Sequence, residues 1–268
     1  MRRAVVFAGV AAVVAAAGCA TVLSIPDGTP SYCASNPGHD YCEDFDVGDA
    51  GSRWTFAETT GGATMSLEPS DRSAPNLLDL TCPSQPLGSS GLAGFTREFD
   101  QSTFAGVHVE ADVRIVTDDG EPPKAKGGIL LVVDKSGGCI GIGLGTFPGG
   151  GSGLGAVIFP EATACSALTG SGPGATSQPE GGTLASTPAP NQWFHVVLVV
   201  TPDPSGNGAG TLSFDIVGQP SSVAPVAIPA GTLVPNGIPL VGFAAEVNGP
   251  SDGLEVQYDN VTIDLKGS

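Results

Sequence analysis

The feature that most narrows the fold of this chain is the lack of any helical pattern after about residue 42. No window of about 11 residues keeps apolar side chains at the i, i+3, i+4, i+7 spacing without an intervening Gly or Pro. Alternating segments recur instead, as in 107–115, where apolar residues at odd positions alternate with His108, Glu110, Asp112 and Arg114. This alternation is typical of a strand with one buried face. About a dozen such segments, separated by turn residues, predict an all-β, two-sheet sandwich.

The clearest strands are predicted at 107–116 and 193–201, and the apolar run 129–133 indicates a strand covered on both faces. Shorter candidates are 63–68, 77–81, 92–99, 139–144, 154–159, 211–217, 240–247 and 254–265. The segment 160–192 is rich in Gly, Pro, Ser and Thr. Because strands flank it on both sides, it is predicted to be a surface excursion of one domain and not a linker between two.

The last predicted strand changes phase along its length. Its apolar residues are even-numbered up to Tyr258 and odd-numbered from Val261 onward. Since alternate residues of a strand face opposite sides, one extra residue is needed between them, and a β-bulge is predicted at Asp259-Asn260. Such a bulge either bends a curved sheet or aims a polar side chain at a functional or ion-binding site, and the pattern leaves both open.

The composition favours a folded, loop-rich β protein. Gly (40) and Pro (23) are abundant, but 41% of the 268 residues are apolar and strand patterns recur throughout. The formal net charge is −17, and no basic stripe offsets it. Such a chain repels nucleic acid, so no nucleic-acid partner is predicted.

The first residues have the layout of an export signal: a basic start over 1–3, an apolar run over 4–17, and small residues before Cys19. A spanning helix needs about 20 apolar residues, more than this run contains. The segment resembles the lipobox of bacterial lipoproteins. The resemblance implies cleavage before Cys19 and a lipid anchor on its sulfur. Ala20 implies the outer membrane over the inner one, where an Asp at this position retains many lipoproteins. Plain secretion and an uncleaved anchor are the alternatives.

The other cysteines are expected to form disulfides in an oxidising compartment. Cys33 and Cys42 enclose a turn-rich segment, and Cys139 and Cys165 flank a Gly-rich stretch, so these are the two predicted pairs. Cys82 is then left over, either as a buried free thiol or as a partner of one of the others, because spacing does not determine connectivity.

Two segments far apart in the chain carry a family resemblance. Residues 41–46, YCEDFD, open the domain, and residues 256–263, VQYDNVTI, close it. Together with the strands between them, they resemble concanavalin A-like lectin/glucanase domains, particularly laminin-G-like domains of bacterial lipoproteins. The resemblance implies a two-sheet antiparallel jelly-roll β-sandwich after a cleaved lipoprotein signal peptide. The predicted organisation is a signal peptide over 1–18, a lipidated tether over 19–40 and the sandwich over 41–268.

Paired carboxylates are the first candidates for catalytic residues. Glu110 and Asp112 share one strand face, as in a glycosidase, but the second glutamate of the glucanase motif is absent and Arg114 follows instead. These three residues are interpreted as a solvated, charge-paired face. His195 lies on the polar side of its strand, with no Ser or Asp partner recognisable from the sequence. No catalytic residue is therefore predicted.

The sequence assigns ligand binding to one tryptophan and to a small set of candidate calcium ligands. Trp54 lies in an irregular segment and is the candidate aromatic platform for a glycan, whereas Trp193 begins an apolar strand and is predicted to be in the core. No cofactor is predicted apart from a structural calcium ion, which the resemblance implies. The oxygen ligands that calcium prefers would come from both ends of the domain. The candidates are Asp44, Asp46, Asp259 and Asn260.

The sequence thus predicts an exported, membrane-anchored lipoprotein whose sandwich is a non-catalytic binding module and not an enzyme. Its predicted partners are the membrane, through the lipid, and an envelope or extracellular glycan, by analogy with the family. One alternative is a structural or adhesion protein that binds a protein partner. A second alternative is a degenerate or unrecognised glycoside hydrolase.

Overall fold

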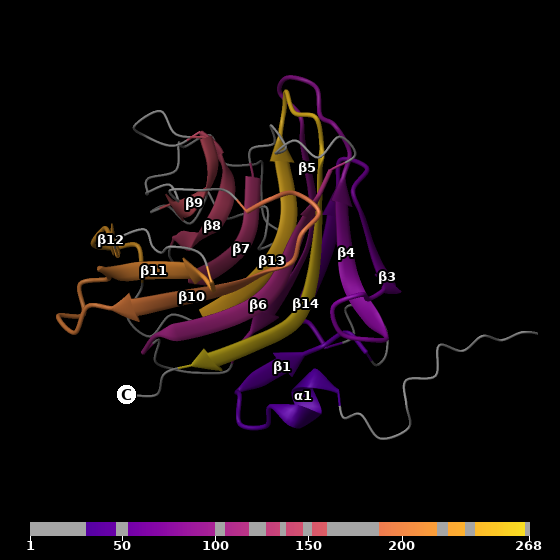
Figure 1. Ribbon diagram of the computed structural model, residues 1–268. Coiled ribbons are helices and arrows are strands. Elements are labelled where there is room, and N and C mark those ends of the chain that lie inside the picture. Colours follow the sequence, from indigo (N-terminus) through magenta and orange to yellow (C-terminus); the bar gives the residue numbers. More distant parts are fainter. Residues whose placement is uncertain are drawn as a thin grey trace, which may run out of the picture.

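The computed structural model describes residues 31–46, 53–99, 105–117, 127–134, 138–146, 152–159, 188–218, 225–233 and 239–265. Within these ranges two antiparallel sheets pack face to face (Figure 1). The prediction of an all-β, two-sheet antiparallel sandwich is confirmed. The described part of the chain has one short helix, α1 (Tyr32–Ser35), and no helix there is long and apolar enough to cross a membrane.

The larger sheet contains eight strands. Seven follow the order β12-β11-β10-β6-β14-β4-β3, and β1 pairs with β14 outside this path. Their bounds are β1 (Tyr41–Glu43), β3 (Thr64–Pro69), β4 (Asn76–Cys82), β6 (Val107–Val116), β10 (Phe194–Pro202), β11 (Gly210–Ile216), β12 (Val226–Ile228) and β14 (Leu254–Leu265).

The smaller sheet has six strands in the order β2-β5-β13-β7-β8-β9. Their bounds are β2 (Phe56–Thr60), β5 (Ser90–Glu98), β7 (Gly127–Asp134), β8 (Cys139–Thr146), β9 (Ser152–Phe159) and β13 (Pro239–Asn248). Strands β1, β2 and β12 were not predicted. The reason is local, because β2 carries polar Thr and Glu residues and β1 and β12 are only three residues long.

The core lies between the sheets and contains the predicted apolar set of β6 at odd positions and the even set of β10. An aromatic cluster anchors one part of it. Trp54 stacks on Phe95 at 5.9 Å and meets Tyr41 and Phe243 edge-on at 5.3 and 5.5 Å between ring centroids. Only 7% of Trp54 is exposed. The prediction that Trp54 is an open ligand platform is therefore wrong, because tertiary contacts bury its indole although the flanking segment is irregular.

The predicted bulge is present in β14. Asp259 pairs with Asp112 and Thr262 with Glu110, so β14 uses one more residue than β6 between the two pairs. Asn260 adopts a positive φ of 51° there. Tyr258 and Val261 consequently both face the core, as the phase change predicted. The bulge turns the Asn260 amide toward Asp112 on the outer face of the sheet.

The first described segment is cross-linked by a disulfide and packs against β14. Cys33 and Cys42 are bonded, which confirms that predicted pair, and β1 pairs with β14 through Tyr41 opposite Ile263. Ahead of β1, His39 Nδ1 lies 2.9 Å from a carboxylate oxygen of Asp264. Part of the predicted tether is thus packed against the larger sheet, close to the outer face described below (Figure 1).

Candidate functional site

The outer face of the larger sheet presents polar side chains in rows that cross the strands. Strand pairing places Asp79 of β4 beside Gln257 of β14, and Gln257 beside Arg114 of β6. Two residues farther along, Asp259 of β14 lies beside Asp112 of β6, which pairs with His195 of β10. Successive rows are about 6.6 Å apart, because a strand rises about 3.3 Å per residue. The second row forms the candidate site.

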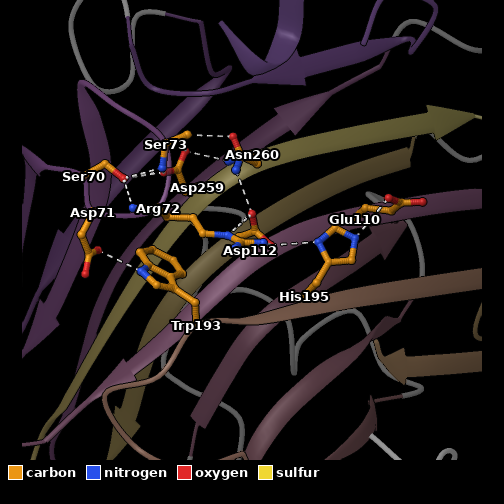
Figure 2. A network of polar contacts seen from close by, with 10 residues as sticks. All are labelled: Ser70, Asp71, Arg72, Ser73, Glu110, Asp112, Trp193, His195, Asp259 and Asn260. Carbon is orange, nitrogen blue, oxygen red and sulfur yellow. Dashed lines mark hydrogen bonds and ion pairs between the residues drawn. The ribbon is translucent and has the colours of Figure 1, made fainter. Parts of the chain in front are cut away.

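His195 lies between two carboxylates. Its Nδ1 is 3.0 Å from Asp112 Oδ1, and its Nε2 is 3.2 Å from Glu110 Oε2. Figure 2 shows the imidazole placed between them, with Arg72 reaching Asp112 from the other side. The hydrogen bond with Asp112 is the main cause that raises the pKa of His195, against an opposing effect of burial. Nε2 therefore faces Glu110 at the more exposed end of the site.

Asp112 is the buried anchor of this arrangement. Arg72 donates to it through Nε at 2.9 Å and Nη2 at 3.2 Å, and the Asn260 amide donates at 2.8 Å. Burial opposes ionisation of Asp112, but the hydrogen bonds from His195, Arg72 and Asn260 outweigh it and lower its pKa to about 2. Asp112 is thus a permanent anion that fixes the ring orientation and tautomer of His195.

The loop between β3 and β4 holds Arg72 over the sheet. Ser70 Oγ donates to Asp259 at 2.7 Å, and Ser73 Oγ lies 2.9 Å from an oxygen of Asp259 and from Oδ1 of Asn260. Burial raises the pKa of Asp259 to about 6 in spite of these hydrogen bonds. The bulge residues therefore anchor the loop that brings Arg72 to Asp112, which gives the bulge a role at the site.

Trp193 lies on the same face, two residues before His195. Its indole is partly exposed, and its Nε1 donates to Asp71 at 2.9 Å. The Arg114 guanidinium lies 4.6 Å from the ring centroid and forms a 2.8 Å ion pair with Asp71. The prediction that Trp193 belongs to the core is wrong, because the inward phase of β10 begins at Phe194.

The interpretation of Glu110, Asp112 and Arg114 as one charge-paired face also needs correction. Arg114 binds Asp71 and, through Nε, Gln257 at 2.7 Å, whereas the partners of Asp112 are Arg72 and His195. No Ser or Asp partner of His195 is recognisable from the sequence, but in the structure Asp112 and Glu110 both lie within hydrogen-bond distance of its ring. Arg72 and His195 come from segments 40 and 83 residues away from Asp112. Strand phase identifies the face of a residue but not its neighbour across the sheet.

The four candidate calcium ligands form two pairs that have different hydrogen-bond partners. Asp44 accepts from the Cys33 N–H at 3.0 Å, and burial and the charge of Asp44 raise the pKa of Asp46 to about 7. Asp259 and Asn260 bind the Ser70–Ser73 loop instead. Among the described residues no group of three or more His, Cys, Asp or Glu side chains is arranged to hold a metal ion.

Four cysteines remain besides the Cys33–Cys42 pair. Cys82 is buried and free, and its thiol lies 2.8 Å from the Ala245 carbonyl oxygen. Cys19, Cys165 and the side chain of Cys139 lie outside the described residues.

No family model matches this sequence, and neither does any curated protein. Solved structures do share its fold. An endo-β-1,4-glucuronan lyase from the fungus Trichoderma reesei superposes with a TM-score of 0.54 at 13% identity, over 85% of this chain and 96% of that one. A PL-14 alginate lyase from Aplysia kurodai gives 0.53 at 11% identity, over 86% and 100%. The alginate lyase Aly36B, in complex with an alginate trisaccharide, gives 0.50 at 15% identity, over 80% and 97%.

The chain therefore has a jelly-roll β-sandwich fold, as predicted. The same comparisons contradict the prediction of a non-catalytic binding module that is not an enzyme, since several of the solved structures that share the fold are polysaccharide lyases. That prediction relied on a missing glucanase motif. A lyase does not use a pair of glucanase carboxylates, so their incompleteness does not argue against an enzyme.

Proposed function

We propose that this protein is an enzyme that cleaves an acidic polysaccharide by β-elimination on the outer face of the larger sheet. The observation that carries the proposal is the His195 arrangement, in which a buried, ionised Asp112 orients an imidazole whose Nε2 meets Glu110 at the exposed end. A positioned base and acid within hydrogen-bond reach of each other are what proton abstraction and leaving-group protonation require. The fold shared with glucuronan and alginate lyases supports this reaction class.

The proposed reaction uses the one proton that His195 and Glu110 share. With this proton on Glu110, Nε2 of the neutral imidazole removes the proton next to the carboxylate of a uronate residue. The electron pair forms a carbon–carbon double bond, the glycosidic carbon–oxygen bond breaks, and Glu110 protonates the leaving oxygen. Transfer of the proton from the imidazolium to Glu110 then restores the starting state.

Binding of an anionic substrate requires basic side chains at the site, because the chain as a whole has a net charge of −17. Arg72, Arg114, His108 and His195 all belong to this face. The Arg72 side chain is 46% exposed and binds Asp112 through only Nε and Nη2. Its guanidinium is in place to neutralise a uronate carboxylate, which increases the acidity of the neighbouring C–H bond.

The test is to incubate the purified full chain with glucuronan, alginate and pectate, and with neutral glucans as controls. We expect ultraviolet absorbance from the new conjugated double bond together with new reducing ends, from at least one acidic polysaccharide. Reducing ends without this absorbance would show hydrolysis and overturn the elimination mechanism. No product from any of these polysaccharides would overturn the proposal as a whole.

The pH dependence of cleavage offers a check on the shared proton. Activity is expected to be bell-shaped, because the pair works only while it holds one proton, and the alkaline limb should lie above about pH 6.5, the ordinary pKa of histidine. Asp112→Asn removes the charge that raises the pKa of His195. Deprotonation then occurs at lower pH, so the alkaline limb of kcat/KM should move down. An unchanged limb would contradict the assignment of that limb to His195.

We also propose that the enzyme is exported and held at the cell envelope through lipid on Cys19, on the strength of the signal-like sequence before that residue. The wild-type chain is expected to sediment with membranes and to be released by detergent but not by salt. Cys19→Ser should appear in the soluble fraction. Membrane association of this variant that resists salt would contradict lipid anchoring.

A further inference from the structure

Trp193 immediately precedes β10, whose second residue is His195, and both side chains lie on the outer face; at about 3.3 Å per extended residue their Cα atoms are about 6.6 Å apart. This spacing is close to the length of one sugar residue in a polysaccharide. The substrate unit next to the one at His195 would therefore lie over the indole of Trp193. This point rests on the proposed cleavage at His195.

The indole is held in a defined orientation from two directions. Asp71 accepts the Nε1 hydrogen bond at 2.9 Å, and Arg114 lies against the ring at 4.6 Å from its centroid. Arg114 is itself fixed by Asp71 and by Gln257. An aromatic ring that is partly exposed yet immobilised by an ion-paired network loses little conformational entropy when a ligand stacks on it.

The contacts of Trp193 do not belong to the packing of the core. The side chain lies outside the aromatic cluster of Trp54, and its hydrogen bond to Asp71 is at the surface. The same hydrogen bond is the main cause that lowers the pKa of Asp71. A partly exposed aromatic side chain that is held by a hydrogen bond to Asp71 and by contact with the largely buried Arg114 is typical of a ligand-binding position.

We propose that Trp193 is a sugar-stacking platform that binds the substrate residue adjacent to the cleavage site. The face of the indole opposite Arg114 packs on the apolar face of a pyranose ring. Arg114 covers the other face and adds a positive charge near the carboxylate of that sugar. Trp193 thereby sets how the polysaccharide is aligned on β10, and it is a binding residue with no part in proton transfer.

Fluorescence tests this without any need for catalysis. The chain has two tryptophans, and Trp54 is buried, so acrylamide quenching reports mainly on Trp193. In the His195→Ala variant, tetrasaccharides prepared from glucuronan and from alginate are added at concentrations that give a calorimetric binding signal. We expect the quenching constant to fall. Unchanged quenching with bound tetrasaccharide, or no binding of either tetrasaccharide, would overturn the platform.

Kinetics then separates the platform from the proposed reaction. Trp193→Ala is expected to raise KM for a tetrasaccharide about 5- to 10-fold with an unchanged pH profile, and Trp193→Phe to recover part of the loss. The matched control is Phe56→Ala, which removes another exposed ring (43%) on β2 of the other sheet. Cleavage with an unchanged KM in Trp193→Ala would overturn the platform and leave the enzyme. Protection of Trp193 from quenching, without cleavage of any polysaccharide by the wild type, would support the platform and overturn the proposed reaction.

Discussion

Replacing His195 with alanine is expected to lower the rate of polysaccharide cleavage by about 10²- to 10⁴-fold, the usual contribution of one acid–base group. The physical reason is that Glu110 and Asp112 keep their places on β6, but the group that accepts the substrate proton is gone. The fold should persist, because Asp112 retains its hydrogen bonds with Arg72 and Asn260. The measurement is kcat/KM on the cleaved polysaccharide, together with a thermal melt of each variant.

Two further variants keep this result interpretable. His195→Gln retains hydrogen-bonding groups but cannot titrate, so it should be as inactive as His195→Ala if proton transfer is the role. His39→Ala is the matched control, because it removes an imidazole paired with Asp264 on the same sheet, away from Asp112. Its cleavage rate should equal that of the wild type. A His195→Ala variant that stays folded and within about threefold of wild-type activity would contradict the assigned role.

Replacing Trp54 with alanine is expected to lower the free energy of unfolding by about 3–5 kcal/mol, as for other large-to-small changes in a core. The indole contacts Tyr41, Phe95 and Phe243, so its removal leaves a cavity between the two sheets. The transfer free energy of the ring and the loss of packing act in the same direction. Urea unfolding monitored by circular dichroism measures the change.

Two control variants test whether the size of the side chain and its burial determine the loss of stability. Trp54→Phe should cost less than Trp54→Ala because it keeps an aromatic ring in the cluster. Leu87→Ala alters a side chain that is 83% exposed and should change stability by no more than about 0.5 kcal/mol. A Trp54→Ala variant that is as stable as the wild type but binds glycan more weakly would contradict a core role for Trp54 and indicate a binding role.

Most of the strands and one irregularity within them were predictable from local pattern. The alternation along β6 and β10 identified their inner and outer faces correctly. The slip between Tyr258 and Val261 placed the bulge in the segment where the register shifts, between Asp259 and Thr262, since a period of two leaves no other way to keep both sets of apolar side chains in the core. The Cys33–Cys42 disulfide followed from a short, turn-rich separation.

The site could not be predicted in the same way. Strand phase placed Glu110, Asp112 and His195 on polar faces, but their meeting depends on β10 pairing with β6 in one register. No sequence pattern indicates a role for Arg72. Its loop is held near Asp112 because Ser70 and Ser73 bind Asp259 of the bulge. Both tryptophans were misassigned for a related reason, since the burial of a side chain next to a strand end depends on what packs over it.

The sequence by itself determined which class of structure this chain adopts, which residues of β6, β10 and β14 face inward and where the final strand must bulge. These are consequences of short-range geometry, in which each residue constrains its immediate neighbours. Only the tertiary structure decided that His195, Asp112, Glu110 and Arg72 form one site, and that Trp193 and not Trp54 is exposed beside it. Those outcomes depend on the register between strands that are far apart in the chain, and register is selected by the packing of the whole core.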